Sequence, residues 1–349
     1  PLLTSDTFQN LIQTHTTADS DDTPITMLTV ISEDSHGFGR VVRNETGEVV
    51  SIIEEAVATP EQLAIQEYNA SVYCFSADWL WDALHRIPIS PKGEYYLTDI
   101  VGIAIEDRLS VRAMTINDPT ETVGINTRVH LAEATEILQK RINTRWMLSG
   151  VTIIDPQTTF IEPSVEIGQD TVIWPNTHLQ GNTSIGQACK IGPNTVLIES
   201  KIGDRSEISA SVIEHALVED DVTIGPFAHL RKGAHLAQGV HMGNFGEIKN
   251  SYLGPGTKMG HFSYLGDATI SSDVNIGAGT ITCNYDGERK NPTEIGAGAF
   301  IGSDTMLVAP VKLGDGARTG AGSVVTKDVP AKTLAVGAPA RAIRKLENK

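Results

Sequence analysis

Residues 161–197 read IEPSVEIGQDTVIWPNTHLQGNTSIGQACKIGPNTVL, with an aliphatic side chain at every sixth position. The series runs Ile161, Ile167, Ile173, Leu179, Ile185, Ile191 and Leu197. A sustained period of six is typical of hexapeptide repeats, in which three hexads form one triangular coil of a parallel β-helix. The aliphatic side chains would fill a narrow interior, and glycine or another small residue would let the chain turn.

The same period continues toward the C-terminus with slips of one residue. The further positions are Ile202, Ile208, Val218, Ile224, Leu230, Leu236, Met242, Ile248, Leu253, Met259, Leu265, Ile270, Ile276, Ile295, Ile301, Leu307, Leu313, Thr319 and Val325. The series breaks between Cys283 and Thr293, which predicts an inserted loop. A loop that interrupts a regular solenoid is costly unless it is used, so the break favours a function for this segment.

The composition agrees with a narrow interior, because 32 glycines accompany only 5% aromatic residues. Residues 1–150 hold 22 acidic and 10 basic residues, a net of −12, out of −16 for the whole chain. This balance argues against binding to nucleic acid or to an anionic membrane. Three widely spaced cysteines form no disulfide framework, and neither a long apolar run nor a signal-peptide pattern is present. The expected location is therefore the cytoplasm.

The first 125 residues follow a different pattern, that of a mixed α/β domain. Strands are expected at 27–31, 49–53 and 71–75, and a helix at 77–87. A longer amphipathic helix is expected over 128–146, with Asn126 and Thr127 as its N-terminal cap. The sequence therefore predicts two domains joined by a helical arm.

Motifs from both halves resemble one bacterial family, the bifunctional N-acetylglucosamine-1-phosphate uridylyltransferase/glucosamine-1-phosphate acetyltransferases. In the second half these motifs are GHFSYLGD at 260–267 and VNIGAGTITCNYDG at 274–287. In the first half they are GFGR at 37–40, IEE at 53–55, QEYN at 66–69, GEYYLTD at 93–99 and VGIN at 123–126. The resemblance implies a partial uridylyltransferase domain over 1–126, a helical arm over 127–150 and a left-handed parallel β-helix over 151–349. It also implies a homotrimer with its acetyltransferase site between subunits.

The resemblance implies N-acetylation of glucosamine-1-phosphate by acetyl-CoA. His261 matches the catalytic histidine of the family, and histidine suits a general base at neutral pH. The residues that match the sugar-phosphate contacts are Arg231, Lys249, Tyr264, Asn275 and Lys290. Arginine and lysine suit this role because the substrate carries a phosphate.

Acetyl-CoA is the co-substrate that the resemblance implies. The matching positions are Ala278, Asn284, Tyr285, Ser303, Ala321 and Arg341. Asn284 and Tyr285 belong to the predicted loop, where they would meet the acceptor and the acetyl group. The small residues would border the pantetheine arm on the outside of the β-helix, and Arg341 would meet the phosphates of CoA.

For the first half the resemblance implies transfer of UMP from UTP, with Mg²⁺ neutralising developing charge. The residues that match UDP-N-acetylglucosamine contacts are Gly39, Glu54, Asn69, Thr98 and Asn126, and Asn126 also matches a Mg²⁺ ligand. Members of the family carry a Gly-rich phosphate loop about 100 residues before the segment that matches Pro1. This chain does not contain that loop, so it is expected to be a fragment with little or no uridylyltransferase activity.

Three alternatives stay open at this stage. One is another sugar-phosphate nucleotidyltransferase with a hexapeptide acyltransferase tail, and another is a β-helix that serves only as a scaffold or an ice-binding surface. A zinc site at His229, His235 and His241 is the third. A spacing of six turns each histidine about a third of a coil from the last, so one chain cannot bring all three to one ion.

Overall fold

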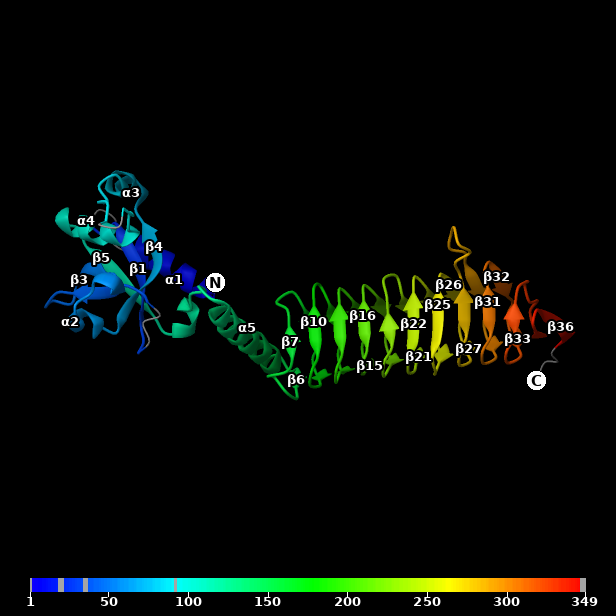
Figure 1. The fold of residues 1–349 in the computed structure, drawn as a ribbon. Helices are drawn as coiled ribbons and strands as arrows, with labels where there is room; N and C mark the ends of the chain where they lie inside the picture. Colours follow the sequence, from blue (N-terminus) through cyan, green and yellow to red (C-terminus); the bar gives the residue numbers. More distant parts are fainter. Residues whose placement is uncertain (1, 18–21, 34–36, 91–92, 346–349) are drawn as a thin grey trace. The chain divides into compact units, whose positions relative to one another are not determined.

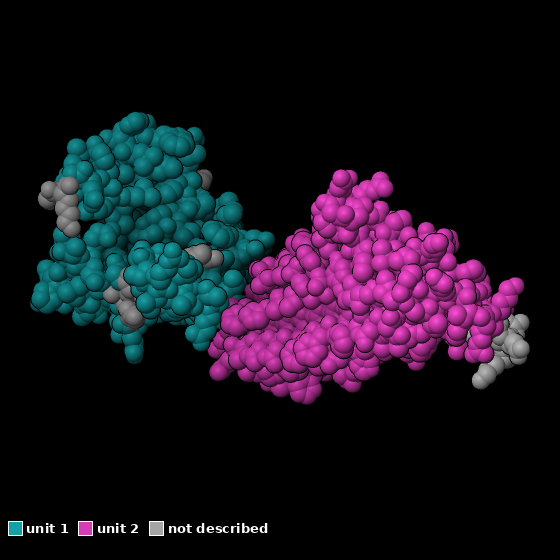
Figure 2. Space-filling model, turned by 45° about the vertical axis from the view of Figure 1, so that its right-hand side comes forward, with its two compact units in different colours: residues 1–138 teal, residues 139–349 magenta. Residues whose placement is uncertain are grey.

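The structure is a computed structural model that describes residues 2–17, 22–33, 37–90 and 93–345 (Figure 1). The chain divides into two compact units, residues 1–138 and 139–349 (Figure 2). The boundary between the units falls inside helix α5, Arg128–Leu148. The hydroxyl oxygen of Thr127 accepts a hydrogen bond from the backbone N–H of His130 at 3.2 Å, which confirms the predicted cap.

The first unit contains a five-stranded mixed sheet in the order β3-β2-β4-β1-β5. Its strands are β1 Ile25–Ile31, β2 Arg40–Arg43, β3 Val49–Ile53, β4 Glu67–Phe75 and β5 Val111–Ile116. Strand β1 pairs antiparallel with the central strand β4 and parallel with the edge strand β5. The three predicted strands are confirmed as β1, β3 and the second half of β4.

Helices accompany this sheet. They are α1 Ser5–Thr16, α2 Pro60–Leu63, α3 Ala77–Leu84 and α4 Ile100–Glu106, with short 3-10 turns η1 Glu55–Val57, η2 Leu97–Asp99 and η3 Pro119–Thr122. The predicted helix at 77–87 is confirmed as α3. Residues of α4 and β1, among them Ile100, Val101, Ile25 and Met27, are buried together in one core cluster.

The second unit is a parallel β-helix built from three sheets of very short strands (Figure 1). The ten-stranded sheet contains β7 Phe160–Ile161, β10 His178–Gln180, β13 Val196–Ile198, β16 Val212–Glu214, β19 His229–Leu230, β22 Gly246–Lys249, β25 Ser263–Gly266, β28 Ile281–Cys283, β31 Met306–Val308 and β34 Val324–Val325. The nine-stranded sheet contains β8 Glu166–Ile167, β11 Ser184–Ile185, β14 Lys201–Ile202, β17 Leu217–Val218, β20 His235–Leu236, β23 Tyr252–Leu253, β26 Ala268–Ile270, β29 Thr293–Ile295 and β32 Val311–Leu313.

The twelve-stranded sheet forms the third side. It contains β6 Thr152–Ile153, β9 Val172–Ile173, β12 Lys190–Ile191, β15 Glu207–Ile208, β18 Thr223–Ile224, β21 His241–Met242, β24 Lys258–Met259, β27 Asn275–Ile276, β30 Phe300–Ile301, β33 Arg318–Thr319, β35 Thr333–Gly337 and β36 Ala340–Lys345. All pairs in it are parallel except the hairpin of β35 and β36. No helix in the described residues combines the length and apolarity needed to cross a membrane.

The six-residue series forms the interior of the β-helix, as predicted. Ile173, Leu179, Ile191 and Leu197 are fully buried, and every other member of the series is at most 7% exposed. Five further described residues that the predicted series does not include pair in register with its members and are at most 7% exposed: Ile153, Ile213, Thr282, Val329 and Ala335. The buried side chains stack in columns along the β-helix, and the strands of successive coils pair in parallel. Together, this burial and this pairing stabilise the fold.

Replacing one interior side chain is expected to destabilise the β-helix. Leu197→Ala removes a fully buried side chain and leaves a cavity, which costs about 2–5 kcal/mol in closely packed interiors. Leu217→Ala is the matched control, because Leu217 lies on the outer face and is 40% exposed. We expect chemical denaturation to show a clear loss of stability for the first variant and almost none for the second. Equal effects would contradict the packing.

Candidate active site

Three of the predicted sugar-phosphate residues lie at neighbouring strands of the ten-stranded sheet. Arg231 directly follows β19, Lys249 ends β22, and Tyr264 lies on β25. Ile248 of β22 is fully buried, so its neighbour Lys249 lies on the outer face, because side chains alternate along a strand. The hexad series therefore places these residues on the outside of successive coils.

The electrostatics show that these cations lie close together. The pKa of Lys249 is lowered, chiefly by the nearby charge of Lys290 and then by Arg231, while Asp267 opposes the shift. Arg231 donates from Nη1 to Oε1 of Glu247 at 2.8 Å, and this hydrogen bond raises the pKa of Arg231. Arg231, Lys249 and Lys290, which we call the basic cluster, thus lie near three carboxylates, Glu214, Glu247 and Asp267. The cations lie close enough to repel one another, and a bound anion would relieve this repulsion.

The loop predicted between Cys283 and Thr293 folds as a small hairpin that projects from the β-helix (Figure 1). Tyr285 and Lys290 pair as an isolated antiparallel bridge, and the hydroxyl of Tyr285 donates to the carbonyl of Gly287 at 2.6 Å. Asn284 at its base is 6% exposed and donates from Nδ2 to Oδ2 of Asp267 at 2.6 Å. The hairpin thereby returns Lys290 toward Lys249.

The turn of this hairpin is held by a carboxylate. Oδ1 of Asp286 accepts from the backbone N–H groups of Glu288 and Arg289, at 2.9 and 2.8 Å. Asn291 donates from Nδ2 to the other oxygen at 2.9 Å. These hydrogen bonds lower the pKa of Asp286 to about 2, so the carboxylate stays ionised and the turn stays closed at neutral pH.

His261 lies at the corner that joins β24 to β25. It follows Gly260, and its side chain is exposed, with no hydrogen bond or ion pair to another described residue. Ala278, Ser303 and Ala321 also each follow a glycine at the corresponding corner of later coils. The corners are bonded in succession, since Gly279 N donates to Phe262 O at 2.7 Å, Asp304 N to Ala278 O at 2.6 Å and Gly322 N to Ser303 O at 2.8 Å. We call this line of four residues the histidine edge.

Two other predicted residues lie outside this grouping. Asn275 is on β27 of the twelve-stranded sheet, a different side of the coil from Lys249 and Tyr264. Arg341 lies on β36, opposite Val336 of β35. A Cβ at Gly320 would lie 2.6 Å from Cγ1 of Val336, so the terminal hairpin packs beside the last corner of the histidine edge.

Gly266 allows Tyr264 and Asn284 to approach each other. A Cβ at Gly266 would contact the Tyr264 hydroxyl and would lie 2.6 Å from Nδ2 of Asn284. Gly266→Ala is therefore expected to displace both side chains and to lower acetyl transfer about tenfold to a hundredfold. Gly102→Ala in α4 is the control, because a Cβ there meets no atom within 4 Å. Unchanged kcat and KM in the first variant would contradict this role.

The first unit brings four predicted residues together. The backbone N–H of Asn69 donates to the carbonyl of Gly39 at 2.9 Å. Thr98 donates from its hydroxyl to Oε1 of Glu54 at 2.9 Å. Asn69 also donates from Nδ2 to the hydroxyl oxygen of Tyr73 at 2.7 Å. Burial, with a smaller contribution from the charge of Glu54, raises the pKa of Tyr73 to about 12.

Tyr73 and Asp267 contact predicted site residues but were not themselves predicted from the sequence. Tyr73 lies four residues after Asn69 on the same strand, so an alternating strand pattern could have placed both on one face. Asp267 stands at the end of the GHFSYLGD motif, but nothing in the sequence indicated its partners.

The described residues do not form a metal site. No group of three or more His, Cys, Asp or Glu side chains in the described part of the chain could hold an ion. Asn126 precedes α5, and its backbone N–H donates to Nδ1 of His130 at 3.3 Å. His229, His235 and His241 fall on three different sheets, as the spacing of six predicts. The residues present therefore fit neither Mg²⁺ nor Zn²⁺ without further ligands.

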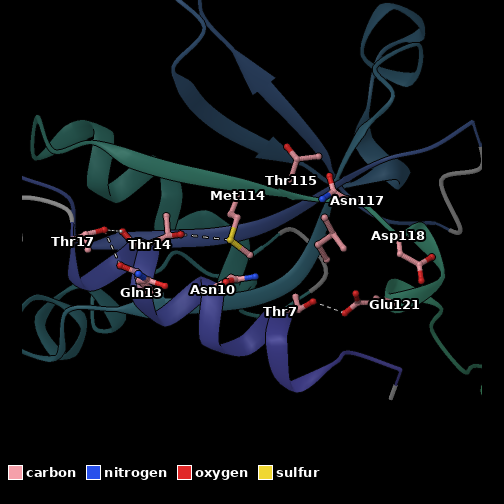
Figure 3. Close-up of a pocket in the computed structure, with 11 residues that line it drawn as sticks. Thr7, Asn10, Gln13, Thr14, Thr17, Met114, Thr115, Asn117, Asp118 and Glu121 are labelled. Atoms are coloured by element: carbon pink, nitrogen blue, oxygen red, sulfur yellow. Dashed lines mark hydrogen bonds between the residues drawn. The ribbon is translucent and has the colours of Figure 1, made fainter. Parts of the chain in front are cut away.

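A polar cavity of about 530 Å³ lies in the first unit between α1 and the end of β5 (Figure 3). Hydroxyl and amide side chains of α1, among them Thr7, Asn10 and Gln13, line one side. Glu121 lies on the other side and accepts a hydrogen bond from the Thr7 hydroxyl at 2.7 Å. None of the predicted site residues lines this cavity, so it is separate from the candidate site.

Two family models match the chain, one in each unit. The family model described as nucleotidyl transferase matches residues 2–125, and the one described as bacterial transferase hexapeptide (six repeats) matches 164–199 and 292–327. A solved UDP-N-acetylglucosamine acyltransferase is 19% identical over 56% of this chain and 74% of its own, with a TM-score of 0.40.

Much closer relatives cover nearly the whole chain. The "Bifunctional protein GlmU" of Heliobacterium modesticaldum is 48% identical over 96% of this chain and 73% of its own length. That of Carboxydothermus hydrogenoformans is 48% identical over 96% of this chain and 75% of its own. Both matching family models describe transferases, one for each unit. The chain therefore belongs to the family of the bifunctional GlmU proteins.

Proposed function

We propose that the β-helical unit transfers the acetyl group of acetyl-CoA to the amine of glucosamine-1-phosphate. The observation that carries this proposal is the close approach of three cations, Arg231, Lys249 and Lys290, beside the projecting hairpin. A phosphate on the sugar would be held by such a cluster through charge-assisted hydrogen bonds. Tyr264 and Asn284 would border the sugar beside it.

His261 would act as the general base. The amine of the acceptor attacks the thioester carbonyl carbon, and His261 accepts a proton from the attacking nitrogen as the C–N bond forms. Collapse of the tetrahedral oxyanion breaks the C–S bond, and the proton held by His261 passes to the departing thiolate. An exposed imidazole that has no hydrogen bond or ion pair with another described residue is free to perform this exchange.

Acetyl-CoA would lie along the histidine edge. Ala278, Ser303 and Ala321 are small, so an extended pantetheine arm can approach the backbone of successive corners. Arg341 stands on the hairpin beside the last corner, where a cation would suit the phosphates of CoA. Asn284 and Tyr285 would meet the acetyl end of the same molecule.

A homotrimer would complete the site. Asn275 lies on a different sheet from the basic cluster, so its contact with the same sugar would require a neighbouring copy of the chain. Under this proposal the β-helix over 151–349 provides acetyl transfer, and the helical arm over 127–150 connects it to the domain over 1–126. The acidic chain would work in the cytoplasm on small molecules, without nucleic acid or membrane partners.

The domain over 1–126 would contribute to UMP transfer from UTP. Gly39, Glu54, Asn69 and Thr98 form a connected polar group that suits the N-acetylglucosamine moiety. Mg²⁺, when bound, would neutralise charge on the reacting phosphates. Asn126 offers one amide oxygen toward it, and further ligands would have to come from groups other than those described.

The decisive experiment measures acetyl-CoA consumption against a panel of amino sugars. Glucosamine-1-phosphate is expected to be the best acceptor, ahead of glucosamine and of glucosamine-6-phosphate. Activity with the 6-phosphate but not the 1-phosphate would overturn the substrate assignment. Absence of thioester consumption with every acceptor would favour a β-helix that serves as a scaffold.

A further inference from the structure

Asp267 links the projecting hairpin to the regular coils. Its carboxylate accepts two amide hydrogen bonds, from Nδ2 of Asn250 to Oδ1 and from Nδ2 of Asn284 to Oδ2, both at 2.6 Å. Its backbone carbonyl accepts from the N–H of Thr293 at 3.1 Å, where the chain rejoins the coil. Asp267 therefore contacts both ends of the hairpin and the coil beneath it.

The backbone at this corner suits an Asp or Asn side chain. Asp267 has φ +51° and Asn250, at the same corner of the preceding coil, has φ +46°. The N–H of Asp267 donates to the carbonyl of Lys249 at 3.2 Å, which continues the stacking of corners. Asp and Asn tolerate this left-handed region better than most other residues. An Asp→Asn substitution therefore leaves the backbone of the corner unstrained.

Asn284 depends on this carboxylate for its position. It is 6% exposed, and a buried amide needs a hydrogen-bond partner to remain where it is. The missing Cβ of Gly266 leaves the space in which Nδ2 of Asn284 and the Tyr264 hydroxyl meet. The backbone carbonyl of Asn284 in turn accepts a hydrogen bond from the N–H of Asn291 at 2.7 Å. The position of Asn284 therefore also determines the position of the far end of the hairpin.

The geometry points to Asp267 as a positioning residue for acetyl transfer: it holds Asn284, and through it the hairpin, against the basic cluster. This inference rests on the proposed function. Asp267 also lies near enough to Lys249 to raise its pKa against the repulsion of Lys290. The same carboxylate therefore orients the hairpin and favours the charged form of the lysine beside it.

Asp267→Asn tests this role. An amide has only one accepting atom, so the variant can accept from Asn250 or from Asn284 but presents a donor to the other. We expect kcat for acetyl transfer to fall about tenfold to a hundredfold, because a small misplacement of reacting groups is costly. KM for acetyl-CoA is expected to rise much less than kcat falls, since the histidine edge, along which most of the molecule would lie, is intact. Hydrogen exchange at the Asn291 amide is expected to become faster.

Two further variants separate positioning from general stability. Asn250→Gly removes the other donor while keeping a positive φ accessible, and it should leave kcat and the exchange of Asn291 unchanged. The double variant Asp267→Asn/Asn284→Asp exchanges the two side chains and restores one hydrogen bond between positions 267 and 284. It should bring the exchange rate of the Asn291 amide back toward that of the wild type.

The outcomes divide clearly. Unchanged kcat or unchanged exchange in Asp267→Asn would overturn the inference, as would a loss of thermal stability with normal kcat in the folded fraction. If the wild-type chain acetylates no amino-sugar phosphate, the proposed function fails instead. In that case the hydrogen-exchange result alone decides whether Asp267 holds the hairpin.

Discussion

His261→Ala is expected to lower kcat for acetyl transfer about 10²- to 10⁴-fold, the usual contribution of a positioned general base. The side chain is exposed and has no hydrogen bond or ion pair with another described residue, so its loss removes no contact from the fold. Unfolding of the variant should therefore match that of the wild type. The measurement is steady-state thioester consumption with glucosamine-1-phosphate, read together with a thermal unfolding curve.

The matched control is His241→Ala, an exposed histidine on the twelve-stranded sheet. Its Nδ1 lies 2.7 Å from the Thr223 hydroxyl, and it is not one of the residues assigned to acetyl transfer. It should leave kcat unchanged. If His261→Ala retained most of its activity with an intact fold, another group would have to accept the proton. His261 would then not be the general base.

The interior of the β-helix could be predicted because it depends on local spacing alone. Each hexad sends one aliphatic side chain inward, so a residue such as Leu197 is buried wherever the period holds. The order of the corners follows from the same period, which is why His261, Ala278, Ser303 and Ala321 fall in one line. The structure adds Ile153, Ile213, Thr282, Val329 and Ala335 to the predicted interior columns.

Contacts made by the hairpin could not be predicted in this way. Asp267 and Asn284 are 17 residues apart, and they meet only because the inserted segment begins one coil later above the same corner. Lys290 approaches Lys249 because the bridge to Tyr285 folds the hairpin back. No sequence repeat indicates either of these two contacts. Lys290 was therefore predicted from the family resemblance and not from spacing.

The first unit shows the same limit. Helix α1 was not predicted, because its apolar residues do not form one buried face: Leu11 is buried, whereas Phe8 and Ile12 are exposed. Its start depends on the Thr4 hydroxyl, which accepts from the N–H of Thr7 at 3.2 Å. The bond between Thr98 and Glu54 joins segments 44 residues apart. Such long-range contacts follow from the packing of the sheet, which no local pattern encodes.

Lys249→Ala is expected to raise KM for glucosamine-1-phosphate about tenfold to a hundredfold while changing kcat much less. Lys249 is one of three cations that repel one another, and a bound phosphate would relieve this repulsion. The rate with unphosphorylated glucosamine should hardly change, so preference for the phosphorylated sugar should shrink. The salt dependence of KM should weaken for the same reason.

Lys312→Ala is the matched control for this variant. Lys312 lies on β32 of the nine-stranded sheet, where its ammonium group pairs with Glu294 at 2.8 Å, away from the basic cluster. Its loss should leave KM for both sugars unchanged. If Lys249→Ala raised KM for glucosamine and glucosamine-1-phosphate equally, the cluster would recognise the sugar ring and not its phosphate. The close approach of Arg231, Lys249 and Lys290 would then need another anion to explain it, and acetyl-CoA would be the next to test.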